Sequence, residues 1–124
     1  HYIMLAHGYG MEVIRSYSFK NAGIVLNKAA VESYSDKPED IDAAQLYEEI
    51  HNSWFSDAVF NSNYPENLLN LLREHMPNEY EEDLKIIGTP LDWLGINYYT
   101  RNLIRFDSKE KWIFLFNFIQ WKNY

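Results

Sequence analysis

Apolar residues at helical spacing open the chain. Positions separated by three and four residues are apolar or small at Ile3, Ala6, Gly10, Val13, Ile14 and Tyr17. This pattern predicts an amphipathic helix that buries this face. A break at 20–23 ends it, and Gly23 suits the start of a strand. The run 23–26, closed by Asn27, lacks polar alternation, which favours a strand buried on both faces in a parallel sheet covered by helices.

A second helical pattern follows a polar loop, which we expect over residues 28–37. Asp36 is the expected N-cap, because Pro38 then falls in the first turn and Glu39 lies three residues beyond the cap. The chain is expected to turn over 56–63. The face expected to be buried carries Ile41, Ala44, Tyr47 or Glu48, Ile50 or His51, and Trp54.

Three further elements complete the pattern. Pro65 is expected at the first position of a helix that Pro77 ends, and a short acidic helix is expected over 79–87. A turn at 88–90 then leads to a second buried strand over 93–99. The predicted buried leucines of the first of these helices are Leu68, Leu69, Leu71 and Leu72.

The spacing of the two strands indicates their direction. About 65 residues separate them, far more than a hairpin loop contains, so we expect them to be parallel in an α/β fold. Two strands alone leave edges of unpaired backbone groups. The pattern therefore predicts that neighbouring strands lie outside this sequence.

The composition of the chain disfavours several classes of binding partner. The net charge is −7, and the basic residues are scattered, which disfavours a nucleic acid partner. No apolar run approaches the ~20 residues that span a bilayer, so we expect no membrane partner and a cytoplasmic location. Cysteine is absent, and the four histidines have no metal-ligand spacing. We therefore expect no metal and no cofactor.

Carboxylates occur in three groups, at 38–40, 48–49 and 79–83. All three fall in expected helices, where acidic residues are typical of solvated faces and first turns. We therefore do not expect a catalytic carboxylate pair among them.

Five short strings, in order along the chain, resemble glycoside hydrolase family 1, the β-glucosidase family. The most specific is Leu-Gly-Ile-Asn-Tyr-Tyr-Thr at 94–100, which resembles the sixth barrel strand of the family. The others are HYIMLAHG at 1–8, IVLN at 24–27, SDKPED at 35–40, and HNSWFSD at 51–57 with Tyr64-Pro65 after it. The IVLN string resembles the fifth barrel strand.

The resemblance implies a fold and a boundary. Residues 1–105 are identified as a partial (β/α)8 TIM barrel, the segment around the fifth and sixth strands. The resemblance fails after Arg105, so residues 106–124 are expected to form a divergent, aromatic-rich tail. Out-of-frame translation and a divergent insertion are both open explanations of this tail.

The resemblance also implies a function, a retaining β-glycosidase. Such enzymes use two carboxyl groups about 5–5.5 Å apart. The family carries them in Asn-Glu-Pro and Glu-Asn-Gly motifs, and neither occurs here. The family order places the first motif upstream of His1 and the second beyond the point where the resemblance fails. The chain alone is therefore expected to be inactive.

Three residues of this chain are implied in the site. Tyr99 would donate a hydrogen bond to the missing nucleophile carboxylate. Asn97 and Asn27 would line the sugar pocket, with Asn27 towards the leaving group. Taken from pattern alone, both asparagines could simply cap strand ends and Tyr99 could be core. Tyr98 should point away from Tyr99, because strand side chains alternate.

Several possibilities stay open. The partner of the intact enzyme would be a β-glucoside, and the chain could bind complementary barrel segments or itself. Two rival functions are a non-enzymatic truncated remnant and a small carbohydrate-binding module that uses its aromatic surface. The choice among glucose, galactose and 6-phosphosugar depends largely on residues outside this sequence.

Overall fold

The structure, a computed structural model, describes residues 1–17 and 21–108, so most of the expected tail lies outside the described residues. The elements in chain order are α1 (Tyr2–Ser16), β1 (Gly23–Ser33), α2 (Pro38–Glu48), the π-helical segment η1 (Glu49–Ser53), α3 (Trp54–Asn61), α4 (Glu66–Leu72), the 3-10 turn η2 (Arg73–His75), α5 (Tyr80–Ile87) and β2 (Trp93–Ile104).

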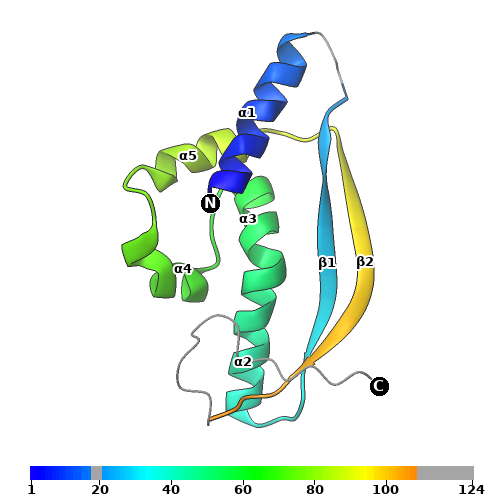
Figure 1. Cartoon of the computed structure of the whole chain (residues 1–124), viewed down its shortest axis with the longest axis vertical. Coiled ribbons are helices and arrows are strands. Elements are labelled where there is room, and N and C mark those ends of the chain that lie inside the picture. The colour runs from blue at the N-terminus through cyan, green and yellow to red at the C-terminus, as the bar shows by residue number, and fades with distance from the viewer. Residues whose placement is uncertain (18–20, 109–124) are drawn as a thin grey trace.

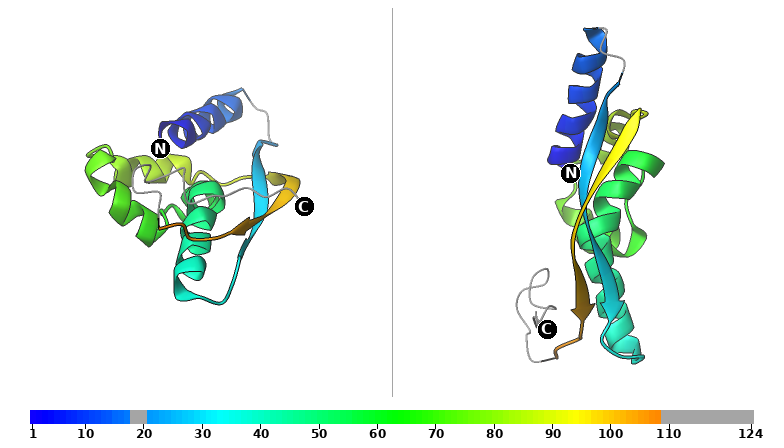
Figure 2. Two further views of the ribbon diagram at one scale, coloured as in Figure 1. Left: turned by 60° about the horizontal axis from the view of Figure 1, so that its bottom comes forward. Right: turned by 90° about the vertical axis from the view of Figure 1, so that its right-hand side faces the viewer.

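The described elements form two layers. Strands β1 and β2 make a long two-stranded ribbon, and α2, η1 and α3 run beside it as one helical rod (Figure 1). The view turned by 90° shows that the helices lie behind the ribbon and that none of them crosses its front (Figure 2, right). The ribbon therefore has one face towards the helices and one open face.

The strands pair in parallel, as predicted. The ladder joins Gly23 to Trp93 at one end and Ser33 to Ile104 at the other. Both strands are longer than expected, so the prediction of a polar loop from residue 28 was wrong up to Ser33. The polar side chains of this segment do not prevent a strand, because pairing with β2 satisfies the backbone N–H and C=O groups of both strands.

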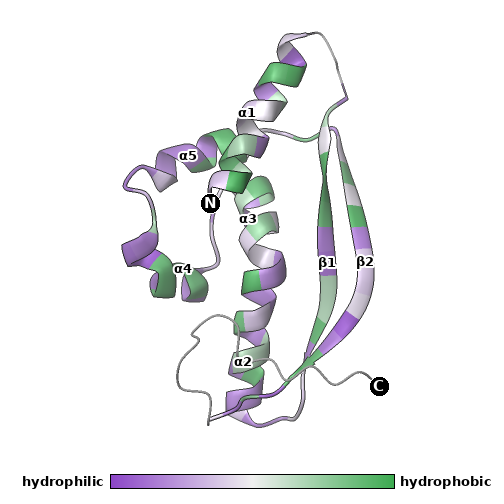
Figure 3. Cartoon of the chain, viewed as in Figure 1, coloured by the Kyte–Doolittle hydropathy of each residue, from purple (hydrophilic) through white to green (hydrophobic). Residues whose placement is uncertain are grey.

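The prediction that the strands are buried on both faces was also wrong. Leu26 is buried, whereas its neighbour Val25 is exposed on the opposite side. On β2, Ile96 is exposed too, although its partner Leu26 is buried against the helices. Within the described residues, no second layer covers the open face of the ribbon (Figure 3).

The main core lies between the helices. Its buried members come from α1, α3, α4, α5 and the loop before α4: Met4, Trp54, Ala58, Val59, Tyr64, Leu68, Leu69, Leu84 and Ile87. The rings of Trp54 and Tyr64 stack with centroids 4.0 Å apart. A smaller cluster joins Val31 and Ile104 of the ribbon to α2. These contacts hold the rod against the ribbon.

The buried face of α1 is not the predicted one. Met4, Gly8 and Met11 are buried, whereas Ile3 is 78% exposed and Val13 is also exposed. The reason is the close approach of α5. A Cβ at Gly8 would lie 2.5 Å from the backbone oxygen of Ile86, so only glycine permits this contact.

A hydrogen-bonded chain ties the first residue to α5. His1 Nδ1 lies 2.9 Å from the hydroxyl of Tyr64, and His1 Nε2 lies 2.8 Å from Asp83 Oδ2. Burial, followed by the charge of Asp83, raises the pKa of Tyr64 to about 12. The phenol therefore stays protonated at neutral pH and keeps its hydrogen-bonding role in the core.

The rod is longer than predicted. The segment expected to turn from residue 56 is helical to Asn61, and the helix ends where Ser62 adopts a left-handed conformation. Helix α4 begins at Glu66, directly after Pro65, one residue later than expected. Of its leucines, Leu68 and Leu69 are buried as predicted but Leu71 is exposed. A seven-residue helix has room for only a narrow buried face.

The start of α2 differs from the prediction as well. Asp36 does not cap it. Ser35 Oγ accepts a hydrogen bond from the Lys37 N–H at 3.3 Å and donates one to Asp40 Oδ2 at 2.5 Å. Asp40 also accepts a hydrogen bond from the Phe106 N–H at 2.8 Å, and it is buried rather than solvated. This carboxylate therefore joins the start of α2 to the chain beyond β2.

Replacing Asp40 by asparagine is expected to reduce the loss of stability in acid. The hydrogen bond from Ser35, followed by that from Phe106, lowers the pKa of Asp40 below its ordinary value. A lowered folded pKa stabilises the fold above about pH 4, and this contribution is lost as pH falls through the folded pKa.

The measurement is the midpoint of urea unfolding at about pH 6 and about pH 3 for wild type and Asp40→Asn. The midpoint of urea unfolding should fall more between the two pH values in the wild type than in the variant. The neighbouring Asp42→Asn, at an exposed position, is the control and should behave as wild type. Equal losses in Asp40→Asn and wild type would contradict this assignment.

Candidate functional site

The ladder brings two of the three predicted site residues together. Asn27 of β1 and Asn97 of β2 are direct partners in the parallel register. The side-chain Nδ2 of Asn97 donates a hydrogen bond to Oδ1 of Asn27 at 3.0 Å. Both asparagines are exposed. One oxygen and one nitrogen of this amide pair are used in the mutual bond, and the remaining groups can bind a ligand.

The register that pairs the asparagines begins at the first pair of the ribbon. Gly23 pairs with Trp93, and a Cβ at Gly23 would lie 2.1 Å from the Trp93 oxygen and 2.6 Å from its indole Cδ2. Only glycine allows the two strands to approach with the indole over this position. Four residues further along each strand, this register places Asn27 opposite Asn97.

Tyr99 lies two residues after Asn97 on β2. Strand alternation places it on the same face as Asn97, with Tyr98 on the other. Its side chain is 77% exposed, and its hydroxyl has no hydrogen bond to the described residues. The alternative that Tyr99 is a core residue is thus wrong for the described part of the chain. The phenol is free to donate a hydrogen bond to a group that approaches the open face.

The three residues do not lie at the ends of their strands, contrary to the prediction. β1 continues to Ser33 and β2 to Ile104. The regular ladder is nevertheless interrupted directly after the site, because Lys28 pairs with Tyr98 while Ala30 pairs with Arg101. Such bulges commonly redirect side chains next to functional sites. Only one further pair, Lys28 with Tyr98, separates the asparagines from the register shift.

Sequence reasoning missed an ion pair just beyond the shift. Arg101 Nη2 donates to Glu32 Oε2 across the ladder, and both side chains are largely exposed. The sequence spacing could have indicated it, because Tyr99 and Arg101 are two residues apart on a strand and therefore lie on one face. An exposed pair contributes little to stability, but it neutralises a positive charge beside the site.

The buried carboxylates of the rod serve the fold. Glu49 was expected to be solvated but is buried. Its carboxylate accepts hydrogen bonds from the Leu68 N–H at 2.9 Å, Asn67 Nδ2 at 2.8 Å and Gln45 Nε2 at 3.3 Å. These bonds fasten the start of α4 to η1. The hydrogen bonds of the Glu49 carboxylate thus go to α2 and α4.

The HNSWFSD string packs the rod, as its aromatic residues indicated. Trp54 belongs to the main core, and the ring of His51 lies 4.1 Å from that of Tyr47. Burial lowers the pKa of His51, so its ring is neutral at neutral pH. Asn52, whose role the sequence did not reveal, instead reaches the ribbon and bonds the backbone of Ala29.

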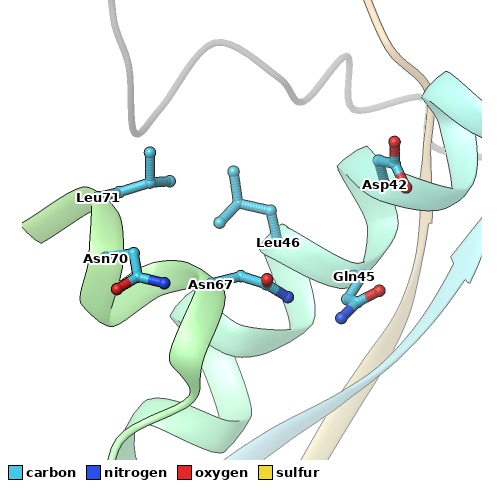
Figure 4. A pocket seen from close by; sticks show the side chains of 6 residues that line it. All are labelled: Asp42, Gln45, Leu46, Asn67, Asn70 and Leu71. Carbon is cyan, nitrogen blue, oxygen red and sulfur yellow. The ribbon is translucent and has the colours of Figure 1, made fainter.

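One hollow of about 650 Å³ lies elsewhere, between α2 and α4 (Figure 4). Its lining comprises Asp42, Gln45, Leu46, Asn67, Asn70 and Leu71. None of the three site residues contributes to it. The hollow therefore lies apart from the candidate site.

Two classes of site are absent from the part of the chain that the structure describes. No three histidine, aspartate or glutamate side chains gather as a metal site there. None of the described helices is both long and apolar enough to cross a bilayer.

Comparison with known proteins gives consistent results. Residues 1–117 match the model of "Glycosyl hydrolase family 1", a range that ends within the segment 106–124. A β-glucosidase of Agrobacterium sp. is 43% identical over 101 residues, which is 81% of this chain and 22% of that enzyme.

Solved structures match as well. The virulence factor SghA, solved with its substrate analog salicin, aligns with a TM-score of 0.82 and 40% identity over 90% of this chain and 25% of SghA. The Thermotoga maritima β-glucosidase in complex with glucoimidazole aligns with a TM-score of 0.75 and 32% identity over 85% of this chain and 24% of that enzyme. The chain thus spans about a quarter of the length of the proteins it matches.

Proposed function

The chain belongs to glycosyl hydrolase family 1 and carries part of its TIM barrel, and on this premise we propose that it supplies part of the sugar site of a retaining β-glucosidase. The substrate class is a β-glucoside, hydrolysed by double displacement. The single observation that supports the proposal most directly is the Asn27–Asn97 pair beside the free phenol of Tyr99 on the open face.

Each site residue has a chemical part in this proposal. The amide groups that Asn27 and Asn97 do not use on each other would bind sugar hydroxyls. Tyr99 would donate to the carboxylate of the nucleophile, which stabilises its charged form and lowers its pKa. The similar proteins solved with salicin and glucoimidazole support a glucoside-like ligand for this site.

The reaction needs two carboxyl groups that this sequence does not provide in the family's motifs. Neither Asn-Glu-Pro nor Glu-Asn-Gly occurs in the 124 residues. We infer that polypeptide completing the barrel brings both carboxylates to the open face. The chain by itself would then not hydrolyse a β-glucoside.

Complementation tests this proposal. The full chain would be co-expressed with flanking segments of a β-glucosidase relative, chosen so that they contain an Asn-Glu-Pro and a Glu-Asn-Gly motif, and assayed with 4-nitrophenyl β-D-glucoside. Activity is expected only when all segments are present. No activity in an assembly that forms would contradict the proposal. Saturable glucose or cellobiose binding by the chain alone, followed by tryptophan fluorescence, would favour a carbohydrate-binding module instead.

Tyr99→Phe is expected to lower kcat/KM in that assembly by about 10- to 100-fold, since a hydrogen bond to a charged group contributes ~1.5–3 kcal/mol. Loss of the donor should also raise the pKa of the nucleophile. The acidic limb of the pH–rate profile should therefore move to higher pH. Tyr98→Phe, at the neighbouring exposed position, is the matched control and should leave both unchanged.

A further inference from the structure

Ala29 of β1 lies where the ladder changes register. Lys28 pairs with Tyr98 and Ala30 pairs with Arg101, so β2 has one more residue than β1 in this step. A register slip by one residue sends each following side chain to the opposite face of a strand. Asn27 and Asn97 lie before the bulge, so they keep their pairing only as long as the bulge stays beyond Lys28 and Tyr98.

The side chain of Asn52 makes two hydrogen bonds to Ala29. Its Oδ1 accepts from the Ala29 N–H at 3.2 Å, and its Nδ2 donates to the Ala29 carbonyl at 2.9 Å. Asn52 is 5% exposed. An amide that pairs with both polar groups of one peptide residue satisfies backbone groups that the interrupted ladder leaves over.

A second contact holds β1 beside Ala29, and it comes from the next turn of the rod. Lys28 Nζ donates to Ser56 Oγ at 2.9 Å, and Ser56 Oγ donates to the Asn52 carbonyl at 3.2 Å. Two consecutive residues of β1 are therefore held by two residues of the rod. Asn27, on the open face, directly precedes Lys28.

The helix itself is altered where Asn52 projects. Residues Glu49–Ser53 form a π-helical segment, and the side chains of Glu49 and Asn52 are both buried and hydrogen-bonded. Single π-turns are rare and occur frequently at functional sites. Here the wider turn lets two buried polar side chains reach different partners, α4 and the ribbon.

We propose that Asn52 is a positioning residue for the sugar site: by holding Ala29 at the bulge, it keeps Asn27 opposite Asn97 on the open face. Asn52 does not touch the ligand. The functional part of this inference rests on the proposed glucosidase role. The structural part, the dependence of the Asn27–Asn97 pair on Asn52, does not.

The structural part is tested by NMR on the full chain. In Asn52→Ala, the Ala29 N–H should exchange with solvent at least about tenfold faster. The cross-relaxation peak between the Asn97 side-chain amide and the Asn27 Hβ protons should disappear. An unchanged peak in a folded Asn52→Ala would overturn the proposal.

Asn102→Ala is the matched control. Asn102 is likewise a buried asparagine, 6% exposed, and joins the ribbon to the rod through the Tyr47 hydroxyl at 2.9 Å. This variant loses one such bond but should keep the Asn97–Asn27 peak. Loss of the peak in both variants would show a general loosening of the ribbon and would overturn a specific role for Asn52.

A second variant decides the question if Asn52→Ala does not fold. Asn52→Asp retains an acceptor for the Ala29 N–H but loses the donor to its carbonyl. The Asn97–Asn27 peak should weaken in this variant. In the complemented enzyme, Asn52→Asp should raise KM for 4-nitrophenyl β-D-glucoside by about tenfold with a smaller change in kcat, since misplaced hydroxyl-binding groups act mainly on binding.

The two parts fail separately. Wild-type assemblies without activity would contradict the proposed function while the NMR result stands. An active wild-type assembly in which Asn52→Asp has the KM of Asn102→Ala would overturn the positioning role alone.

Discussion

Replacing Trp54 by alanine is expected to destabilise the chain by about 3–5 kcal/mol, the range for removing a large aromatic side chain from a core. Trp54 is 8% exposed and belongs to the cluster that joins α1, α3, α4 and α5. Its ring stacks on that of Tyr64 at 4.0 Å, and such aromatic pairs add ~0.5–1.5 kcal/mol beyond burial. The loss should appear as a lower midpoint in urea unfolding followed by circular dichroism.

Phe60 provides the matched control on the same helix. It is also aromatic but 50% exposed, and it is not part of the core cluster. Phe60→Ala is expected to cost about 1 kcal/mol or less, close to other substitutions away from the core. Similar losses in the two variants would show that the Trp54–Tyr64 stack does not anchor the rod.

Replacing Glu49 by alanine should have the second largest effect. The buried carboxylate receives hydrogen bonds from Leu68, Asn67 and Gln45. Hydrogen bonds to a charged group contribute ~1.5–3 kcal/mol, and a buried N–H without a partner costs ~1–3 kcal/mol. We therefore expect a loss of about 2–4 kcal/mol in urea unfolding, together with faster amide exchange in α4.

Two variants separate charge from contact at this position. Glu49→Gln keeps an acceptor for the Leu68 N–H but turns a donor towards Asn67, so its loss should be smaller than that of Glu49→Ala. Glu48→Ala changes the neighbouring carboxylate, whose hydrogen bond comes from Ser53 Oγ at 2.6 Å. It should cost about 1 kcal/mol, as for a single hydrogen bond. Equal effects of Glu48→Ala and Glu49→Ala would contradict the role assigned to Glu49.

Local patterns predicted the elements well and their environments poorly. The helical spacing from Ile3 to Tyr17 predicted α1 correctly, yet chose a face that is exposed. Periodicity records which residues are apolar, whereas burial depends on which neighbour approaches. Gly8, a residue without a side chain, decided that question by admitting the backbone of α5.

The ends of elements show the same limit. The polar segment after Asn27 lacks strand-like alternation, but it extends β1 to Ser33 because β2 lies beside it. The π-helical segment and the helix beyond residue 56 likewise depend on Glu49 and Asn52 finding partners far away in the chain. No local pattern contains those partners.

The sequence by itself determined the family and the parallel direction of the two strands, and it predicted three candidate site residues. It could do so because the LGINYYT string and the long connection are properties of the chain. The tertiary structure alone decided that Asn27 faces Asn97, that Tyr99 is exposed, and that Asn52 bonds the backbone of Ala29 at the bulge. Each of these depends on the register between strands about 70 residues apart or on a helix packed behind them, and register is set by close contacts across the fold.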